Sequence, residues 1–472
     1  MRLDHALDGL SSVVIVGDPS TEVRDVVIDD RGVVDGSLFV CLRGATTDGH
    51  DHAEAAQARG ATALLCERPL ALDVAHAVVP DSRVAMAPVA AAVYGHPSHA
   101  LAVIGVTGTN GKTTTTHLLA HVLDHAGLAC TTVGTLTGGF STPTTPEAPL
   151  LQAALAQALN EGKAAAAIEV SSHALMRHRV DATRFAVAVF TNLSQDHLEE
   201  HGTMDAYFEA KASLFTEHEV GAAVVCTDDR WGRALVERIR GLHLPLRTYS
   251  SEDVADDGSI RWDERAVRVP LPGRHNALNA LAAAHAADVL GVAPAAVADA
   301  LGRAPGVPGR FEVVDAGQPF TVMVDYCHTP DALLVALGEA RRLAGGARTV
   351  VVFGCGGERD HTKRGPMGEA AALLADVVVV TTDNPRHEDP DAIIAEVVAG
   401  TRSSGARQDV EVLIIPDRRA AIARAVGLAR VGDVVLLAGK GHEPYQEVQG
   451  VKHHLDDREE AVAALADLGW RR

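Results

Sequence analysis

The sequence is poor in aromatic residues and in positive charge, and it has no long apolar run. Phe, Trp and Tyr make up 4% of the 472 residues, so Ala, Val and Leu must fill the cores. Lys and Arg number 42 against 62 Asp and Glu, a formal net charge of −20. General nucleic-acid binding needs a basic surface, so we expect no nucleic-acid partner. Apolar runs such as Val377–Val380 are too short to span a bilayer, so no membrane association is expected.

From the cysteines and the first residues we expect neither disulfides nor a signal peptide. Its six cysteines are scattered without a CxxC spacing, so we expect buried free thiols in a reducing compartment. The first twenty residues are interrupted by charges and do not resemble a signal peptide. These features predict a cytoplasmic protein. We expect a monomer whose partners are small-molecule substrates.

Apolar, strand-like runs alternate with helical patterns along most of the chain. This alternation predicts an α/β fold with parallel sheets covered by helices on both faces, and the length favours several domains. We expect three. Residues 1–97 form a small α/β domain, residues 98–306 a central ATPase domain of the P-loop type, and residues 307–472 a Rossmann-like domain. Segments rich in Gly and Pro near both boundaries support this division.

A glycine-rich loop gives the strongest local signal. The run Gly108-Thr-Asn-Gly-Lys-Thr113 follows a predicted strand and opens a predicted helix. Backbone N–H groups at such a helix start can cradle phosphate. Lys112 can reach the terminal phosphates, and the Thr113 hydroxyl can bind Mg²⁺. The loop is shorter than the standard GxxxxGK[ST] motif, because Val106 stands where the first Gly would be. The alternative is a glycine turn before an ordinary helix.

Two further residues are candidate metal ligands. Glu169 ends the predicted strand Ala165–Val170, and His197 follows the next one. A polar residue at a strand end of an α/β sheet points into the ligand crevice, and neutral imidazole is a common metal ligand. A surface Glu and a structural His are the alternatives.

Seven motifs, in order and with their spacing, resemble those of the Mur ligase family of peptidoglycan synthesis. They are Gly108-Thr-Asn-Gly-Lys-Thr113, Glu169-Val-Ser-Ser-His173, Asn192-Leu-Ser-Gln-Asp-His-Leu198, Tyr207-Phe-Glu-Ala-Lys-Ala-Ser-Leu-Phe215, Gly273-Arg-His-Asn-Ala-Leu-Asn279, Pro308-Gly-Arg-Phe311 and Asp325-Tyr-Cys-His-Thr-Pro330. Together they cover nearly the whole chain. The resemblance implies an ATP-dependent ligase that activates a carboxylate as an acyl phosphate and joins it to an amine.

The resemblance also implies roles for individual residues. Lys211 matches a lysine that is carbamylated by CO₂ and helps to hold Mg²⁺, and a carbamate supplies the oxygen ligands that Mg²⁺ prefers. The metal ligands implied are Thr113, Glu169, His197 and Lys211, and the catalytic residues are Lys112, Glu169, His197 and Lys211. The implied ATP-binding residues are Gly108, Thr109, Asn110, Gly111, Lys112, Thr113, Thr114, His275, Asn276, Arg310, Asp325 and His328. Without the family, Lys211 reads as a solvated helix residue.

Three predicted strand ends in the last domain can form an amino-acid pocket. Their pattern resembles the UDP-N-acetylmuramoyl-tripeptide synthetase branch, which adds the third residue of the stem peptide. In that branch Asp383-Asn-Pro-Arg386 is typical of enzymes that use meso-2,6-diaminopimelate, whose distal carboxylate Arg386 can hold in a bidentate pair. Glu443 can pair with the distal ammonium. The residues implied for this pocket are Arg359, Asp383, Asn384, Pro385, Arg386, Gly439 and Glu443. A turn-capping Arg386 is the alternative.

The carboxylate substrate implied is UDP-MurNAc-L-Ala-D-Glu. The residues that match its contacts are Asp30, Arg31, Thr144, Thr145, Pro146, Glu147, Ser171, Ser172 and Arg179. The chain departs from the family at Asp30, where Ser is usual, at Cys327, where Ala is usual, and at Arg177, where many relatives have Gln. Two other functions therefore stay open: a related ligase of another pathway with a different acceptor or amine, and a non-catalytic nucleotide-binding protein.

Overall fold

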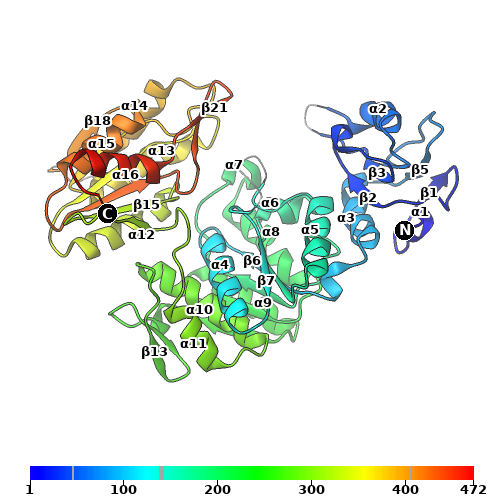
Figure 1. Cartoon of the computed structure of the whole chain (residues 1–472), viewed down its shortest axis with the longest axis horizontal. Helices are drawn as coiled ribbons and strands as arrows, with labels where there is room; N and C mark the ends of the chain where they lie inside the picture. The colour runs from blue at the N-terminus through cyan, green and yellow to red at the C-terminus, as the bar shows by residue number, and fades with distance from the viewer. Residues whose placement is uncertain (45–46, 138–142, 404, 406, 408, 472) are drawn as a thin grey trace.

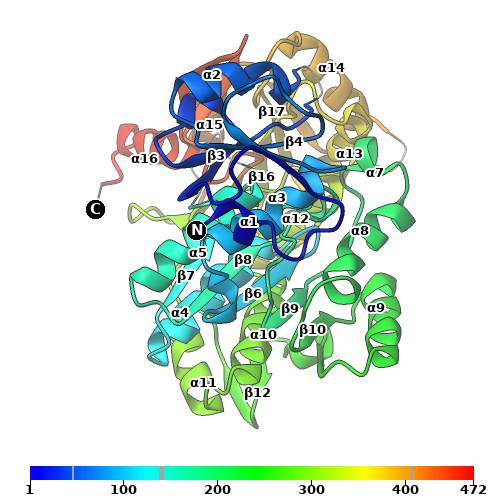
Figure 2. The same ribbon diagram turned by 90° about the vertical axis from the view of Figure 1, so that its right-hand side faces the viewer.

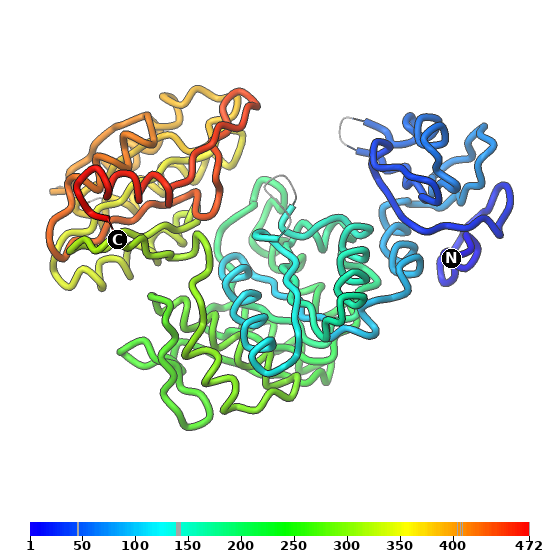
Figure 3. Tube along the Cα trace, viewed as in Figure 1, coloured from blue at the N-terminus to red at the C-terminus, as the bar shows by residue number. Residues whose placement is uncertain are grey.

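The chain folds into three α/β units, each built on its own sheet (Figure 1). The computed structural model describes residues 1–44, 47–137, 143–403, 405, 407 and 409–471. The N-terminal and C-terminal units lie at opposite ends in Figure 1, and both lie above the central unit when the molecule is turned (Figure 2). The colour order along the tube shows that each unit is one continuous stretch of chain (Figure 3).

The N-terminal unit has a five-stranded sheet in the order β1-β5-β4-β3-β2, in which only β1 runs antiparallel to its neighbour. Its apolar strands and helix α3 form one buried core. The elements are α1 (Leu3–Ala6), β1 (Val14–Val16), β2 (Asp25–Val27), β3 (Ser37–Val40), α2 (Ala53–Ala58), β4 (Ala63–Cys66), β5 (Ala75–Val78) and α3 (Ser82–Val93).

The central unit has a six-stranded parallel sheet in the order β11-β10-β9-β6-β8-β7. Two apolar cores contain alternate residues of its strands, which places helices over both faces. The elements are β6 (Ala102–Thr107), α4 (Lys112–His125), β7 (Cys130–Val133), α5 (Ala148–Asn160), β8 (Ala165–Glu169), α6 (Ser172–Met176), β9 (Val187–Phe190), α7 (Leu198–His201), α8 (Met204–Thr216), β10 (Ala223–Cys226), α9 (Arg230–Gly241), β11 (Leu246–Tyr249), β12 (Ile260–Trp262), β13 (Arg265–Val267), α10 (Arg274–Val289) and α11 (Pro294–Gly302).

The C-terminal unit has a second six-stranded sheet, in the order β14-β15-β19-β16-β17-β18, with β14 antiparallel at one edge. A separate antiparallel hairpin, β20–β21, follows the last strand of this sheet. The elements are β14 (Glu312–Val314), β15 (Thr321–Asp325), α12 (Pro330–Ala344), β16 (Thr349–Phe353), α13 (Arg364–Leu374), β17 (Val377–Val380), α14 (Pro390–Gly400), β18 (Glu411–Ile414), α15 (Arg418–Leu428), β19 (Val434–Ala438), β20 (Tyr445–Val448), β21 (Val451–His454) and α16 (Asp457–Asp467).

The α/β class with parallel sheets is confirmed. The division into domains after residues 97 and 306 stays a prediction; the first boundary falls in a short 3₁₀ turn, Pro97–His99, just before β6. Among the described residues, no helix is both long enough and apolar enough to cross a membrane.

Candidate active site

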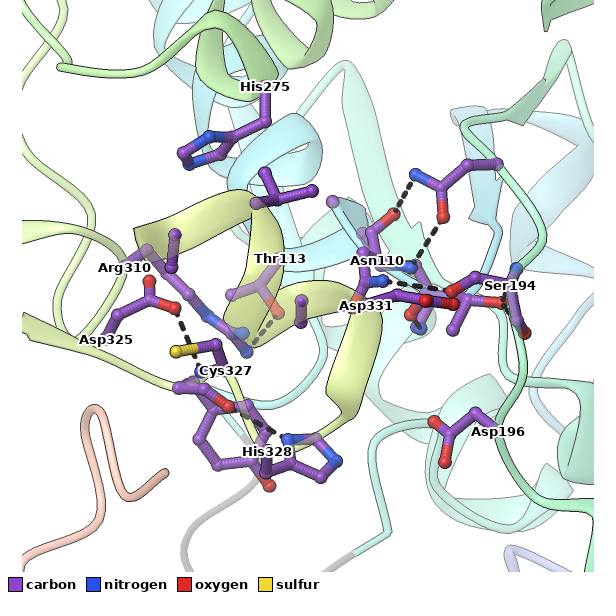
Figure 4. Close-up of a pocket in the computed structure, with 18 of the residues that line it drawn as sticks. Asn110, Thr113, Ser194, Asp196, His275, Arg310, Asp325, Cys327, His328 and Asp331 are labelled. Atoms are coloured by element: carbon purple, nitrogen blue, oxygen red, sulfur yellow. Dashed lines mark hydrogen bonds between the residues drawn. The ribbon is translucent and has the colours of Figure 1, made fainter. Parts of the chain in front are cut away.

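The central and C-terminal units share one cleft, with a volume of about 910 Å³. The central unit contributes the glycine-rich loop, the segment after β9 and the start of α10. The C-terminal unit contributes the segment after β15 and the loops after β16, β17 and β19. In both sheets the lining therefore comes from the carboxyl ends of parallel strands, where ligands bind in α/β proteins. Figure 4 shows part of this lining.

The glycine-rich loop requires glycine at two positions. Gly108 has φ +146°, and a Cβ there would lie 1.9 Å from Thr191 Oγ1. Gly111 has φ +90°, and a Cβ there would lie 2.3 Å from Asn279 Oδ1. Asn192 fixes the loop between them, accepting from the Thr109 N–H at 2.9 Å with its carbonyl and from the Asn110 N–H at 3.0 Å with its side chain. At these two positions the loop is therefore packed too closely for any residue larger than glycine.

Two lysines, partly buried Lys112 and buried Lys211, share one carbonyl oxygen of this loop. Lys112 Nζ donates to the carbonyls of Gly108 and Thr109, both at 2.9 Å. Lys211 Nζ, which comes from α8, also donates to the Gly108 carbonyl at 2.9 Å. Burial lowers the pKa of Lys112 and lowers that of Lys211 strongly, with Lys112 adding to the effect on Lys211. The neutral amine of Lys211 is therefore accessible at a lower pH than in a solvated lysine.

Thr113 and Glu169 form an oxygen-rich corner beside the loop. Thr113 Oγ1 donates to Glu169 Oε2 at 2.9 Å, and Arg310 donates to Thr113 Oγ1 at 3.0 Å. Thr135 holds the same carboxylate through its N–H at 2.8 Å and its hydroxyl at 3.1 Å. Glu169 is 1% exposed. Mg²⁺ commonly binds one or two protein oxygens together with phosphate oxygens and water, so this pair fits the ion.

His197 lies in the same cleft, although it is not at the end of β9 itself. It precedes α7 with φ +53°, and its Nε2 lies 3.4 Å from Asp196 Oδ2. Burial lowers the pKa of His197 to about 4, so the imidazole is neutral at pH 7 and can act as a ligand. Within the described part of the chain, no three His, Cys, Asp or Glu residues are grouped so that they could hold a metal by themselves.

The predicted nucleotide residues other than Gly108 line the cleft, from both units. His275 and Asn276 open α10, and burial lowers the pKa of His275. The Arg310 guanidinium lies 4.5 Å from the centroid of the Tyr326 ring. Asp325 accepts from the N–H groups of Phe311 and Cys327 at 2.8 and 2.9 Å. Its carboxylate therefore joins the segment entering the C-terminal unit to the end of β15.

The residues predicted for the amino-acid pocket, other than Pro385, also line the cleft. Asn384 Nδ2 donates to Glu443 Oε2 at 2.9 Å, and Lys440 Nζ lies 3.2 Å from the same oxygen. Burial raises the pKa of Glu443, while Lys440 opposes the rise. Arg386 donates to the Gly357 carbonyl at 2.5 Å, and its Nε lies 3.6 Å from Glu447 Oε2. Arg359, Asp383 and Gly439 complete this side of the lining.

Lys440 is the residue of this pocket that the sequence interpretation missed. It is fully buried and pairs with the carboxylate that was predicted to hold a substrate ammonium. Ser194, Asp196 and Lys363 also line the cleft without having been predicted. Ser194 lies beside Asn110 in Figure 4, where its hydroxyl is 3.5 Å from Asn110 Nδ2. Asp196 and Ser194 fall inside a motif that was recognised, so the motif itself was the available signal.

The residues predicted to hold the UDP-sugar peptide divide into three groups. Thr144 lies in the cleft. The next group adjoins it: Thr145 Oγ1 donates to the Glu169 carbonyl at 2.7 Å and accepts from the Ser171 N–H at 3.0 Å. Glu147 accepts from Arg179 at 3.0 Å and from Arg83 of α3 at 2.7 Å, which ties the central unit to the N-terminal unit. Pro146 lies between Thr145 and Glu147, and Ser172 opens α6; neither belongs to the cleft lining.

The third group, Asp30 and Arg31, lies in the N-terminal unit and does not line the cleft. Asp30 is flanked by two basic side chains, with His52 Nδ1 at 3.5 Å and Arg59 Nε at 3.4 Å from its carboxylate oxygens. Arg31 makes an ion pair with Asp29 at 2.7 Å. The carboxylate that replaces the usual Ser is therefore offset by nearby positive charge.

The fold and the cleft define a class of enzyme in which a phosphate-binding central unit works with a Rossmann-like partner unit. Three family models match in succession: "Mur ligase family, catalytic domain" over residues 22–105, "Mur ligase middle domain" over residues 106–287, and "Mur ligase, glutamate ligase domain" over residues 309–441. The chain belongs to the Mur ligase family.

Relatives in this family match over nearly their full length. A UDP-N-acetylmuramoyl-L-alanyl-D-glutamate--2,6-diaminopimelate ligase of Geobacillus thermodenitrificans is 44% identical, with 99% of this chain and 100% of the relative covered. The ligase of the same name in Streptomyces coelicolor is 43% identical, with 94% and 93% covered. A solved structure of a ligase of that name has 34% identity and a TM-score of 0.66, with 99% of each chain covered.

Proposed function

We propose that the protein joins the amino group of meso-2,6-diaminopimelate to the D-Glu carboxylate of UDP-MurNAc-L-Ala-D-Glu, with ATP converted to ADP and phosphate. One observation carries this proposal. A single cleft joins the phosphate-binding loop to the loop Asp383–Arg386, in a chain that matches diaminopimelate ligases over its whole length. A monomeric state and a cytoplasmic location stay predictions from the sequence.

The first chemical step forms an acyl phosphate. A carboxylate oxygen of the acceptor attacks the γ-phosphorus of ATP, and the bond to the β-phosphate oxygen breaks as ADP leaves. Lys112, Arg310 and the N–H groups of the loop neutralise the charge that spreads over the transferring group. Lys112 must exchange its bonds to the loop carbonyls for bonds to phosphate. Arg310 reaches this position because it already contacts Thr113.

Mg²⁺ fits the corner made by Thr113 and Glu169, where it would supply positive charge to the phosphates. His197 is a second neutral donor in the cleft. Lys211 cannot bind a cation as an ammonium. Its lowered pKa favours the neutral amine, which is the form that adds to CO₂, and the resulting carbamate would present oxygen atoms beside the loop. These assignments extend the family resemblance to this chain.

The second step forms the amide. The nitrogen of the incoming amino acid attacks the acyl carbon, the carbon–oxygen bond to phosphate breaks, and the nitrogen loses a proton. Arg386 and Arg359 would hold the distal carboxylate of diaminopimelate, and Glu443 its distal ammonium. Because Lys440 already pairs with Glu443, the substrate ammonium would share this carboxylate. Lysine lacks the distal carboxylate, so neither arginine would gain a partner from it.

The acceptor peptide would contact Thr144–Glu147, Ser171, Ser172 and Arg179, while its uridine end extends to the N-terminal unit. Arg179 is nearly buried and donates to the Thr145 carbonyl at 3.1 Å as well as to Glu147, so it is held in place before any substrate arrives. Asp30 would lie near the uridine. The neighbouring Arg59 guanidinium reduces the repulsion that a lone carboxylate would exert on a diphosphate.

The test is phosphate release with ATP, Mg²⁺ and UDP-MurNAc-L-Ala-D-Glu, comparing meso-diaminopimelate with L-lysine. We expect release with diaminopimelate and little with lysine. Equal release with both would keep the ligase and reject the pocket assigned to Arg386. Release with neither amine would favour a related ligase with another acceptor, and ATP binding without turnover on any acceptor would favour a non-catalytic nucleotide-binding protein.

A further inference from the structure

The hairpin β20–β21 stands apart from the three main sheets. Its strands are joined by Gln449 and Gly450, which have φ +51° and +74°. Two consecutive residues with positive φ match the tight hairpin turn whose twist suits the flanking strands. All four residues of β21 are exposed, whereas those of β20 are partly buried. The hairpin therefore contributes little to a core. Its partly buried strand, β20, packs against another segment of the protein.

Strand β20 faces the loop Asp383–Arg386. Gln446 Nε2 donates to the Asp383 carbonyl at 2.8 Å and lies 3.3 Å from the Thr382 carbonyl. The Glu447 N–H donates to Asn384 Oδ1 at 2.9 Å. Two successive hairpin residues, Gln446 and Glu447, therefore form hydrogen bonds with the segment Thr382–Asn384.

The hairpin also holds the backbone of Arg386 on both sides. The Arg386 N–H donates to the Glu447 carbonyl at 3.1 Å, and the Arg386 carbonyl accepts from the Gln449 N–H at 2.7 Å. Arg386 has φ +53°, a left-handed conformation that an arginine adopts only when its surroundings enforce it. The hairpin supplies that enforcement, and the conformation sets the direction in which the arginine side chain leaves the backbone.

We propose that the β20–β21 hairpin is a specificity element and that Gln446 is its main positioning residue. It acts through the loop Asp383–Arg386, which it holds so that Arg386 can meet the carboxylate of an amino acid with two charged ends. This inference rests on the proposed function. It predicts that loosening the hairpin harms recognition of the amine substrate while leaving ATP and the acceptor peptide unaffected.

The experiment uses the full chain with Gln446→Leu, which removes both donors, and His453→Leu as the matched control. His453 pairs with Gln446 across the hairpin and is exposed. We expect Gln446→Leu to raise the KM for meso-diaminopimelate by about tenfold, the size of one or two lost hydrogen bonds. The KM for ATP and kcat at saturating diaminopimelate should stay unchanged, and the preference for diaminopimelate over lysine should fall. His453→Leu should change none of these.

A second variant, Gln446→Glu, keeps the side-chain shape and loses the N–H donors, so the same loss of preference is expected. In a double-mutant cycle with Arg386→Ala, the two effects should be clearly less than additive, since both act on one contact. An unchanged preference in both Gln446 variants, or an equal rise in all three KM values, would overturn the inference. Failure of the unmodified enzyme to use diaminopimelate would instead reject the proposed function.

Discussion

At the scale of single residues, burial decides what Lys211 can do. A lysine on a helix is expected to be solvated, yet α8 turns Lys211 inward until it is 1% exposed and bonded to the Gly108 carbonyl. The site lies beside Lys112, and two neighbouring ammonium groups in a water-poor place repel each other. Converting one of them to an anionic carbamate would remove that repulsion, which gives the modification a physical reason in this chain.

Lys211→Ala should therefore lower kcat by roughly 100-fold or more, the size expected when a preorganised group that stabilises the transferring phosphate is removed. Formate or bicarbonate should restore part of the activity, because either anion can occupy the space left by a carbamate. Lys163→Ala is the matched control, since Lys163 precedes β8 at the end of that strand opposite to Glu169. Unchanged turnover of Lys211→Ala in steady-state phosphate-release assays would contradict the proposed role.

Arg386→Ala should raise the KM for diaminopimelate far more than the KM for ATP. Removing one partner of a bidentate charged pair costs about 2–5 kcal/mol, which corresponds to roughly 30-fold or more in KM. The comparison is with Arg240→Ala, which removes an exposed arginine that pairs with Glu237 within α9. Parallel rises for both substrates would argue for a general folding defect in place of a carboxylate contact.

At the scale of elements, the sequence predicts the buried strands well and the exposed ones badly. Val377–Val380 forms β17 as its uninterrupted apolar run indicates, because a parallel strand covered on both faces needs such a run. The hairpin β20–β21 was missed because its strands carry Gln, Glu, Lys and His with little apolar pattern. Its register follows from a turn and from bonds to a distant loop, and neither is visible in a local window.

Some candidate site residues were predictable from the local sequence, whereas contacts between distant segments were not. The loop Gly108–Thr113 and the strand-end Glu169 were predictable because their chemistry is tied to a local strand–loop–helix pattern. The pairing of Lys440 with Glu443 and the contact of Arg310 with Thr113 depend on how separate segments meet. The sequence alone identifies such residues one by one, but it does not show which of them are in contact.

Helices α15 and α16 are joined by an ion pair between Arg418 and Asp457, both fully buried. Asp457→Asn should destabilise the protein by about 3–5 kcal/mol, because it leaves a buried guanidinium without its counter-charge. Glu460→Gln breaks the exposed pair with Arg419 on the same two helices and should cost less than about 1 kcal/mol. Chemical denaturation of both variants measures the difference, and equal effects would contradict the role assigned to burial.

At the scale of the whole molecule, buried neutral histidines make the fold sensitive to acid. Burial lowers the pKa of His442 to about 3, against about 6.5 for a solvated imidazole. Between these values the unfolded chain binds a proton that the folded chain does not, so stability falls as the pH drops from about 6.5 towards 3. His275, His285 and His328 are shifted in the same direction by burial.

The melting temperature should therefore decline between pH 7 and pH 4, and His442→Gln should make that decline shallower. The test compares the slopes of melting temperature against pH. Stability at pH 7 alone does not test the role of His442, because the substitution also changes packing. His453→Gln, on the exposed strand β21, should leave the slope as it is. An identical slope in His442→Gln would show that His442 gains its proton equally in the folded and unfolded chains.

The Gly108 carbonyl, which accepts from both Lys112 and Lys211, also affects product release. When a nucleotide departs, Lys112 has two backbone oxygens of its own loop to return to, so no buried ammonium is stranded without a partner. Between the nucleotide-free and the nucleotide-bound site, Lys112 therefore exchanges its hydrogen bonds and loses none of them. A loop built this way trades some tightness of binding for easy release, which favours an enzyme that must discharge ADP at every cycle.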